Sequence, residues 1–179
     1  VVGESETGFV GADEHTGRVY FMANKETPLE RHLYVTDLNT KRPNEPRKVS
    51  REAGWHDAKL LPGGRGYLDA FSAPDQPPNA SLRTIDGTVQ HWLVRNALDE
   101  SHPYHSHWKD HVREEFGSIA AADGQQLYYR IIKPARLEAG KQYPVVIDTY
   151  GGPHAQYVHK DWMGGPRAAQ GYFRQVLAQ

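Results

Sequence analysis

Short apolar runs separated by turn residues fill the first half of the chain. Residues 17–23 and 32–37 are rich in β-branched and aromatic side chains, and residues that favour turns bound each run. Little helical periodicity is present before about residue 96. The pattern predicts a succession of β-strands joined by turns.

The same pattern returns weakly after 49 residues. Gly66 follows Gly17 by 49 positions and opens a similar run, and Leu82 follows Leu33 by the same interval. A period near 50 with about four short strands is typical of β-propeller blades, because one blade cannot bury both of its faces alone. We therefore expect antiparallel four-stranded units with at least one open edge. An ordinary β-meander is the alternative.

The character of the chain changes near Asn96. Residues 96–113 are polar and contain a proline and four histidines, which predicts a linker or a crossing between domains. Residues 115–120 and 126–134 then flank the turn Asp123-Gly124. Asp-Gly between two strand-like runs is a strong signal for a β-hairpin.

Two further elements follow the predicted hairpin. Residues 143–150 are apolar on both faces, as in a strand that helices cover on both sides. Residues 167–179 place five apolar side chains near helical spacing, namely Ala168, Tyr172, Phe173, Val176 and Leu177. The sequence therefore predicts a buried strand and then a helix.

Composition and charge exclude several classes of function. The 179 residues are 38% hydrophobic and 24% charged, which is a globular composition. The net charge is −1 and no block of five like charges occurs, so we expect no nucleic-acid partner and no binding to an anionic membrane. The apolar stretches are too short for a transmembrane helix or a signal peptide.

The absence of cysteine excludes disulfides, thiolate catalysis and cysteine-based zinc sites. The chain begins at Val1 without an initiator methionine and ends at Gln179 within an apolar run. Both ends look cut, and we expect a piece of a longer protein.

The strongest local signal for chemistry follows the apolar run of residues 143–150. Tyr150-Gly151-Gly152-Pro153 is a tight-turn sequence that lets backbone approach a ligand, and a loop at this point of an α/β-hydrolase supplies an oxyanion donor. The alternative is a common turn without function. No serine follows Ser118 and none lies in G-x-S-x-G, so Asp148 and His154 complete no triad.

Histidines offer a second candidate site. A metal site is conceivable at His102, His105, His107 and His111, since the last two could share a helix face. However, the stretch contains Pro103 and lacks a carboxylate at zincin spacing, which favours a solvated linker. We interpret His56 as a residue at the edge of a blade. The glycine-rich motifs that bind phosphates are absent from the sequence.

Taken in order, these segments resemble a known family. The C-terminal part looks like the start of the catalytic domain of the prolyl oligopeptidase family of serine peptidases, on residues 122–127, 132–134 and 143–156. The N-terminal part is similar to the last propeller blades of the dipeptidyl peptidase IV branch, on residues 17–21, 31–34, 54–56, 69–72 and 86–87. Residues 96–98, 102–104 and 115–117 look like the bacterial members of that branch.

The resemblance implies a mixed fold, with all-β propeller blades followed by the N-terminal strands of an α/β-hydrolase domain. Residues 1–112 would be the last blades plus a linker, and residues 113–179 the start of the catalytic domain. The family's oxyanion tyrosine corresponds to Tyr150. The nucleophilic Ser, the Asp and the His would follow Gln179. The family's paired glutamates lie in earlier propeller sequence, and the one such pair here, Glu114-Glu115, stands in the catalytic part instead.

The implied parent is a serine exopeptidase that releases N-terminal X-Pro or X-Ala dipeptides from peptide substrates by acyl transfer, with no cofactor and no metal. The chain would be an internal slice of about a quarter of it and inactive alone. The resemblance leaves open whether the parent is a homodimer and whether it is located in the periplasm or the cytoplasm of a bacterium. The alternatives are a prolyl tripeptidyl or acylaminoacyl peptidase of the same family, or a propeller binding protein without activity.

Overall fold

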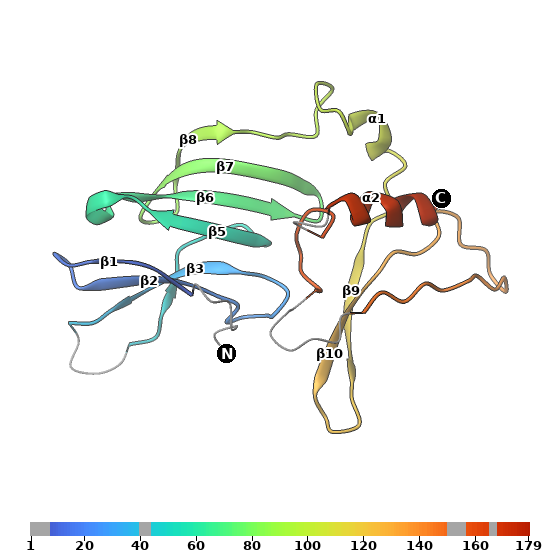
Figure 1. Cartoon of the computed structure of the whole chain (residues 1–179), viewed down its shortest axis with the longest axis horizontal. Coiled ribbons are helices and arrows are strands. Elements are labelled where there is room, and N and C mark those ends of the chain that lie inside the picture. Colours follow the sequence, from blue (N-terminus) through green and yellow to red (C-terminus); the bar gives the residue numbers. More distant parts are fainter. Residues whose placement is uncertain (1–7, 40–43, 150–156, 165–167) are drawn as a thin grey trace.

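The computed structural model describes residues 8–39, 44–149, 157–164 and 168–179. In this part of the chain, two four-stranded antiparallel sheets lie beside a two-stranded hairpin and two helices (Figure 1). The first sheet contains β1 (Phe9–Asp13), β2 (Arg18–Ala23), β3 (His32–Asp37) and β4 (Arg47–Lys48). The second sheet contains β5 (Trp55–Leu60), β6 (Gly66–Ala73), β7 (Gln76–Thr84) and β8 (Val89–Val94), with a 3-10 turn η1 (Pro62–Gly64) between β5 and β6.

The 49-residue repeat corresponds to these two sheets. In each sheet the strands pair in the order of the sequence, and the repeated runs form the second and third strands of each unit. The edges stay open, and the only bridge between the sheets among the described residues is a single parallel one from Arg31 to Trp55. The expectation of antiparallel four-stranded units with an open edge is therefore confirmed.

The apolar core lies mainly in the first sheet. Alternate residues of β2, Tyr20 and Met22, are buried because side chains along a strand point to opposite faces in turn. Leu33 and Val35 of β3 join them, and Tyr67 of β6 completes the cluster from the second sheet. Burying each such side chain contributes about 1.5–3 kcal/mol, so this cluster holds the two sheets together.

The second sheet buries charge instead. Arg83 of β7 is fully buried, and its Nε lies 2.9 Å from the Asp69 carboxylate of β6. Its Nη1 lies 2.8 Å from the carboxylate of Glu52. The His56 ring of β5 faces the same Asp69 carboxylate at 3.0 Å through Nδ1, and its Nε2 donates to the Glu52 carbonyl at 2.9 Å.

His56 lies on β5, the edge strand of the second sheet, as interpreted, but its side chain does not face solvent. The ring is fully buried and stacks on Phe71, with a centroid distance of 4.5 Å. A buried imidazole needs partners for both ring nitrogens, and Asp69 and the Glu52 carbonyl provide them. His56 is therefore part of the interior of the second sheet.

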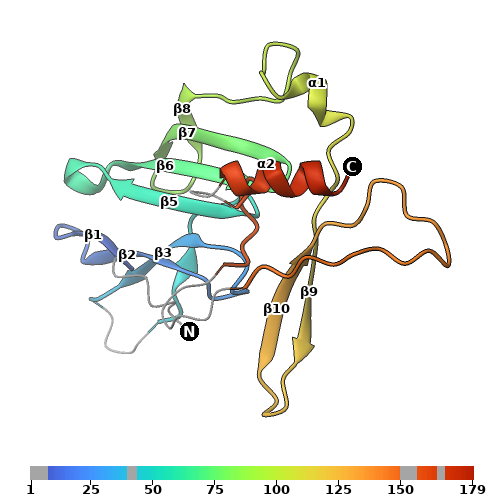
Figure 2. The same cartoon turned by 45° about the vertical axis from the view of Figure 1, so that its right-hand side comes forward.

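The remaining elements lie apart from the two sheets. The Asp123-Gly124 turn joins β9 (Glu115–Ala120) and β10 (Gln126–Ile131), which pair antiparallel as predicted. Gly124 takes a positive φ of 86°, the conformation that makes glycine favourable in this turn. Figure 2 shows this hairpin projecting away from the sheets, with helix α2 (Ala168–Leu177) near the sheet ends. That helix confirms the periodicity seen in the sequence.

The buried strand predicted for residues 143–150 does not form over residues 143–149, and Tyr150 lies outside the described residues. Val145, Val146 and Ile147 are 80%, 77% and 79% exposed. A strand with two apolar faces needs neighbouring strands and covering layers, and no strand in the described part pairs with this run. None of the described helices has the length and apolarity that a bilayer crossing requires.

We predict that Asp69→Asn lowers the free energy of unfolding by about 3–5 kcal/mol, because it removes the buried charge that faces Arg83 and His56 and leaves only the partly exposed Glu52 carboxylate to pair with Arg83. Urea denaturation of the 179-residue chain measures the change. Glu45→Gln is the matched control, because it breaks the exposed pair between Lys25 and Glu45 and should change stability by less than about 1 kcal/mol. Equal effects of the two substitutions would contradict the prediction.

Candidate functional site

Tyr150, the predicted oxyanion donor, lies outside the described residues, as does His154. The structure describes the chain on both sides of this segment. On the N-terminal side, Asp148 forms an ion pair with Arg174 of α2. On the C-terminal side, residues 157–164 lie against the ends of both sheets. We call residues 157–164 the docking segment.

Backbone hydrogen bonds attach the docking segment to both sheets. The Lys160 N–H donates to the Leu29 carbonyl at 2.8 Å, in the turn between β2 and β3. The Trp162 N–H donates to the Ser72 hydroxyl of β6 at 3.3 Å. Since Trp162 and its neighbours Asp161 and Met163 are all buried, the segment is packed against the rest of the molecule.

An aromatic contact reinforces this attachment. The His159 ring stacks on Trp55 at the start of β5, with a centroid distance of 4.1 Å and an interplanar angle of 29°. The Arg31 guanidinium lies 6.0 Å from the centroid of the same Trp55 ring and forms an ion pair with Asp57 at 3.6 Å. The docking segment therefore contacts β5 as well as β6.

A chain of polar side chains continues from the docking segment into the first sheet. The Lys160 ammonium lies 2.7 Å from one oxygen of Glu30, and the other oxygen accepts from His32 Nε2 at 3.1 Å. The Ser50 hydroxyl lies 2.9 Å from His32 Nδ1. Burial raises the pKa of Glu30, but the bonds from Lys160 and His32 outweigh burial and hold this pKa below its ordinary value.

Glu30, His32 and Ser50 have the residue types and contacts of a hydrolytic triad, but they cannot act as one. Ser50 is 1% exposed, and its hydroxyl also accepts the Leu33 N–H at 3.1 Å. A peptide carbonyl cannot reach a nucleophile in this position, and the hydroxyl is already held by two partners. The three residues are therefore part of the attachment between the docking segment and the first sheet.

The linker contacts the docking segment through several rings, but none of residues 96–113 is buried and more than half are exposed, in agreement with the expected solvated linker. It contains the short helix α1 (His105–Trp108). The rings of Trp108, His111, Tyr104 and Tyr172 gather around Trp162, and His111 lies nearly parallel to the Trp162 ring at 6.0 Å. Aromatic pairs of this kind contribute about 0.5–1.5 kcal/mol beyond their buried area, which explains why a polar sequence folds here.

The histidines of the linker do not form a metal site in the structure. Within the described ranges, no group of three or more His, Asp or Glu side chains is arranged to hold a metal ion. His105 Nδ1 contacts the Leu98 carbonyl, and His111 Nδ1 contacts the Tyr104 hydroxyl. Burial lowers the pKa of His111 below its ordinary value.

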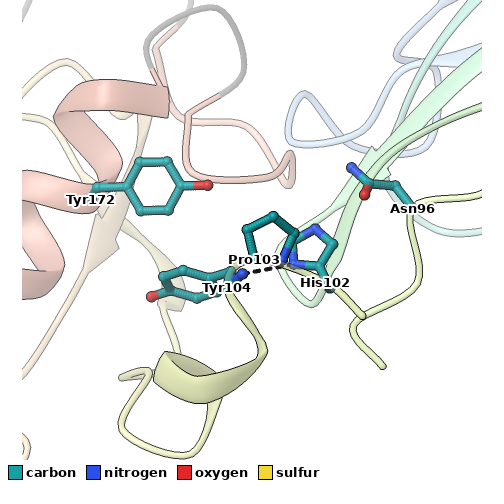
Figure 3. A pocket seen from close by; sticks show the side chains of 5 residues that line it. All are labelled: Asn96, His102, Pro103, Tyr104 and Tyr172. Carbon is teal, nitrogen blue, oxygen red and sulfur yellow. Dashed lines mark hydrogen bonds between the residues drawn. The ribbon is translucent and has the colours of Figure 1, made fainter. Parts of the chain in front are cut away.

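An open hollow of about 450 Å³ lies beside this aromatic cluster. Figure 3 shows the five side chains that line it, from the end of the second sheet, the linker and α2: Asn96, His102, Pro103, Tyr104 and Tyr172. His102 Nδ1 accepts the Tyr104 N–H at 3.1 Å. Among the described residues that line it, none is a carboxylate, and the lining offers ring surfaces and hydrogen-bonding groups.

The two adjacent glutamates at the start of β9, Glu114 and Glu115, point to different partners. Glu114 is buried and lies 3.4 Å from Arg130 of β10, which also faces Asp161 of the docking segment at 3.8 Å. Burial raises the pKa of the Glu114 carboxyl above its ordinary value. Glu115 is exposed and pairs with Lys133 at 2.8 Å. The pair therefore does not form one carboxylate site for a substrate amine.

Comparison with known proteins finds relatives that match most of the chain. The family described as "Dipeptidyl peptidase IV (DPP IV) N-terminal region" matches residues 3–78. Mouse dipeptidyl peptidase 8 is 29% identical over 163 residues, which cover 87% of this chain and 17% of that protein. Human dipeptidyl peptidase 8 is 28% identical over the same length.

A solved structure matches as well. Dipeptidyl peptidase 4 from Porphyromonas gingivalis superposes with a TM-score of 0.72 and 25% identity, covering 86% of this chain and 21% of that one. The chain thus spans about a fifth of the length of the relatives it matches.

Two successive four-stranded antiparallel units, followed by a linker and a hairpin, form a mostly β arrangement, and a solved dipeptidyl peptidase superposes on 86% of the chain. The family match, the sequence relatives and the superposition agree on the same group of proteins. Residues 3–78 match the N-terminal region of the dipeptidyl peptidase IV family, and the similarity to dipeptidyl peptidases extends over 87% of the chain.

We predict that the stability of the chain falls on acidification through His32. Burial lowers the pKa of His32 below its ordinary value of 6.5, and Glu30 opposes this only in part. The unfolded chain therefore binds a proton that the folded chain does not. The stabilisation is present above about pH 6.5 and is lost as the pH falls toward the lower pKa of the folded state, by up to about 1.4 kcal/mol per pH unit.

Urea denaturation at pH 7.5 and 5.5 tests this effect by comparison with His32→Gln. The variant should be less stable at pH 7.5 but should lose less stability on acidification. Part of the pH dependence should persist in the variant, because burial lowers the pKa of His111 too. An identical loss in both proteins would show that His32 does not take part.

Proposed function

We propose that the chain is the junction between the propeller and the catalytic domain of a serine exopeptidase. Residues 1–112 would end the propeller and form the linker, and residues 113–179 would begin the α/β-hydrolase domain. The parent would release N-terminal X-Pro or X-Ala dipeptides. The single observation that supports this most is the similarity to dipeptidyl peptidases over 87% of the chain.

The exposed apolar surface of the C-terminal part supports the same proposal. Val145, Val146 and Ile147 are exposed in a run that pairs with no strand of the described part of the chain, and Phe173 and Val176 of α2 are exposed as well. An exposed apolar surface of this extent usually marks a place where another part of a protein, or a partner, packs. A sheet whose further strands come from later sequence would pair with the run and cover it.

The proposed chemistry is acyl transfer. The parent's serine would attack the scissile carbonyl while a histidine moves the proton. The Tyr150 hydroxyl would donate a hydrogen bond to the oxyanion, together with a backbone N–H beside the nucleophile. A tyrosine suits this task because its neutral O–H is a donor on a side chain with few torsions, so aiming it loses little entropy.

The products would separate this proposal from its alternatives. A dipeptidyl peptidase releases two residues from the N-terminus of a peptide, a prolyl tripeptidyl peptidase releases three, and an acylaminoacyl peptidase releases one blocked residue. Mass spectrometry of the fragments that the full-length protein releases from unblocked and acetylated peptides distinguishes them. A protein that releases none would be the propeller binding protein without activity.

We predict that the 179-residue chain alone has no peptidase activity. In this proposal the nucleophile, its base and the orienting carboxylate all come from later sequence, and oxyanion stabilisation without them leaves only weak catalysis. The assay is hydrolysis of a Gly-Pro or Ala-Pro chromogenic amide by the purified chain. Turnover that survives repurification and scales with chain concentration would refute the prediction.

In the full-length protein, we predict that Tyr150→Phe folds normally but loses turnover. The substitution removes one hydroxyl and keeps the ring, so packing changes little. The lost hydrogen bond would be made only in the transition state, so kcat should fall about 10²–10³-fold with a smaller change in KM. An unchanged kcat would remove Tyr150 from the mechanism.

The matched control is Tyr143→Phe, which removes a hydroxyl from a half-buried tyrosine at the start of the same apolar run. That hydroxyl accepts the Glu138 N–H and donates to the Arg136 carbonyl. Its loss should affect the local loop and leave kcat near the wild-type value. The melting temperature of both variants shows whether folding is intact.

A further inference from the structure

Two buried histidines face each other where the two sheets meet. His32 begins β3 and His56 lies on β5, and the centroids of their rings are 5.3 Å apart. The backbone joins the sheets at the same place, because the His56 N–H donates to the Arg31 carbonyl at 3.0 Å. Since both rings are almost completely buried, the number of protons that each ring carries bears directly on the contact between the sheets.

The hydrogen-bond partners of His56 require a proton on both of its ring nitrogens. Nδ1 lies 3.0 Å from each oxygen of the Asp69 carboxylate, and Nε2 lies 2.9 Å from the Glu52 carbonyl oxygen. A carbonyl oxygen can only accept, and the contact with Arg83 Nε at 2.9 Å favours an ionised Asp69. A neutral imidazole has a single N–H and would leave one of these acceptors without its donor.

The charge balance of the cluster agrees with this assignment. The carboxylates of Asp69 and Glu52 carry two negative charges, and Arg83 carries one positive charge. A charged His56 makes the group neutral as a whole. A neutral His56 would leave a net negative charge around the fully buried Asp69, and uncompensated buried charge is strongly unfavourable.

The partners of His32 have the opposite requirement and fit a ring with one proton. Nε2 donates to the Glu30 carboxylate at 3.1 Å. The Ser50 hydroxyl accepts the Leu33 N–H at 3.1 Å, so its hydrogen is available for His32 Nδ1 at 2.9 Å. A second ring proton, on Nδ1, would face the Ser50 hydrogen and would force this buried hydroxyl to give up its acceptor.

The surrounding charges do not remove this conflict. Burial lowers the pKa of His32 below its ordinary value, the nearby His56 and Lys48 act in the same direction, and Glu30 opposes them only in part. Glu30 is also shared with Lys160, at 2.7 Å. The charged groups that face the two rings are Glu26, Glu30, Lys48 and, through Glu30, Lys160 around His32, and Glu52, Asp69 and Arg83 around His56.

We propose that His32 and His56 form a pH-sensitive switch at the contact between the two sheets, in which His56 is held with two ring protons and His32 with one. Acid adds a proton to His32 and places two positive rings side by side. Base removes a proton from His56 and leaves one of its acceptors without a donor. Either change loosens the contact, so the sheets are held best within a limited range of pH. This inference does not rest on the peptidase function proposed above.

The two histidines act on opposite sides of that range. A histidine in an unfolded chain has a pKa of about 6.5. Above this pH the unfolded chain loses the proton that the folded chain keeps on His56, so the stabilisation from His56 falls as the pH rises. Below this pH the unfolded chain binds a proton that His32 does not bind in the folded chain, so the stabilisation from His32 falls as the pH falls. Each ring changes the equilibrium constant of unfolding by up to about tenfold per pH unit.

Nuclear magnetic resonance of the 179-residue chain tests the two protonation states directly. Long-range proton–nitrogen correlation spectra at pH 7.5 distinguish an imidazolium from each tautomer of a neutral ring. We expect an imidazolium at His56 and a neutral ring with its proton on Nε2 at His32. Assignment through the backbone of the wild type identifies each ring, so the measurement needs no variant. A neutral ring at His56, or a charged ring at His32, would overturn the proposal.

Urea denaturation between pH 5 and pH 9 tests the consequence. His56→Gln should lose part of the fall in stability that the wild type shows above pH 7.5. In the same variant His32 should gain its proton at a higher pH than in the wild type, because the neighbouring positive ring is gone. His91→Gln is the matched control, because His91 is exposed on β8 and should change neither property. An alkaline fall of equal size in the wild type and in His56→Gln would contradict the switch.

Discussion

The buried carboxylate of Asp69 sets the conditions under which the second sheet can fold. It is shared by a guanidinium from β7 and an imidazole from β5, and Glu52 supplies a second acceptor to both of those groups. Isolated charges are very unfavourable in an interior, so each of these side chains is tolerated only because the others are in place. The apolar cluster between the sheets stabilises the assembly, but this network decides how β5, β6 and β7 lie against one another.

The docking segment is likewise held by specific contacts, and these reach across the molecule. Its contacts alternate between backbone hydrogen bonds, a stacked ring pair and a partly buried ion pair, and they reach both sheets. The linker and α2 then close over Trp162, where Gln175 of α2 exchanges two hydrogen bonds with the backbone of Val112. Segments far apart in the sequence are therefore held by a few specific polar and aromatic contacts rather than by a broad apolar interface.

The sequence predicted the local elements well, and the reason is physical. The strands of the two sheets follow from β-branched and aromatic runs bounded by turn residues, the hairpin from Asp123-Gly124, and α2 from its helical spacing, all of which are properties of nearby residues. The burial of His56 and the ion pair of Lys160 with Glu30 were not predicted, because their partners stand 13 and 130 positions away. The strand prediction for residues 143–149 failed for the same reason, because a strand forms only when neighbouring strands pair with it. The one sequence signal for these polar contacts was the presence of Glu30 and His32 beside apolar residues.

The buried face of β7 has a consequence for how this sheet finds its pairing. That face carries Asn79, Ser81 and Arg83, while Leu82 lies on the less buried side. A slip of one residue would exchange the two faces, and burial of apolar area would not oppose it, since the slipped strand would bury Leu82. The slip is opposed because it would move Arg83 away and leave the buried Asp69 carboxylate without this partner. In this sheet, electrostatic interactions therefore determine the register of the strands. The hydrophobic effect makes the sheet compact but does not select the register.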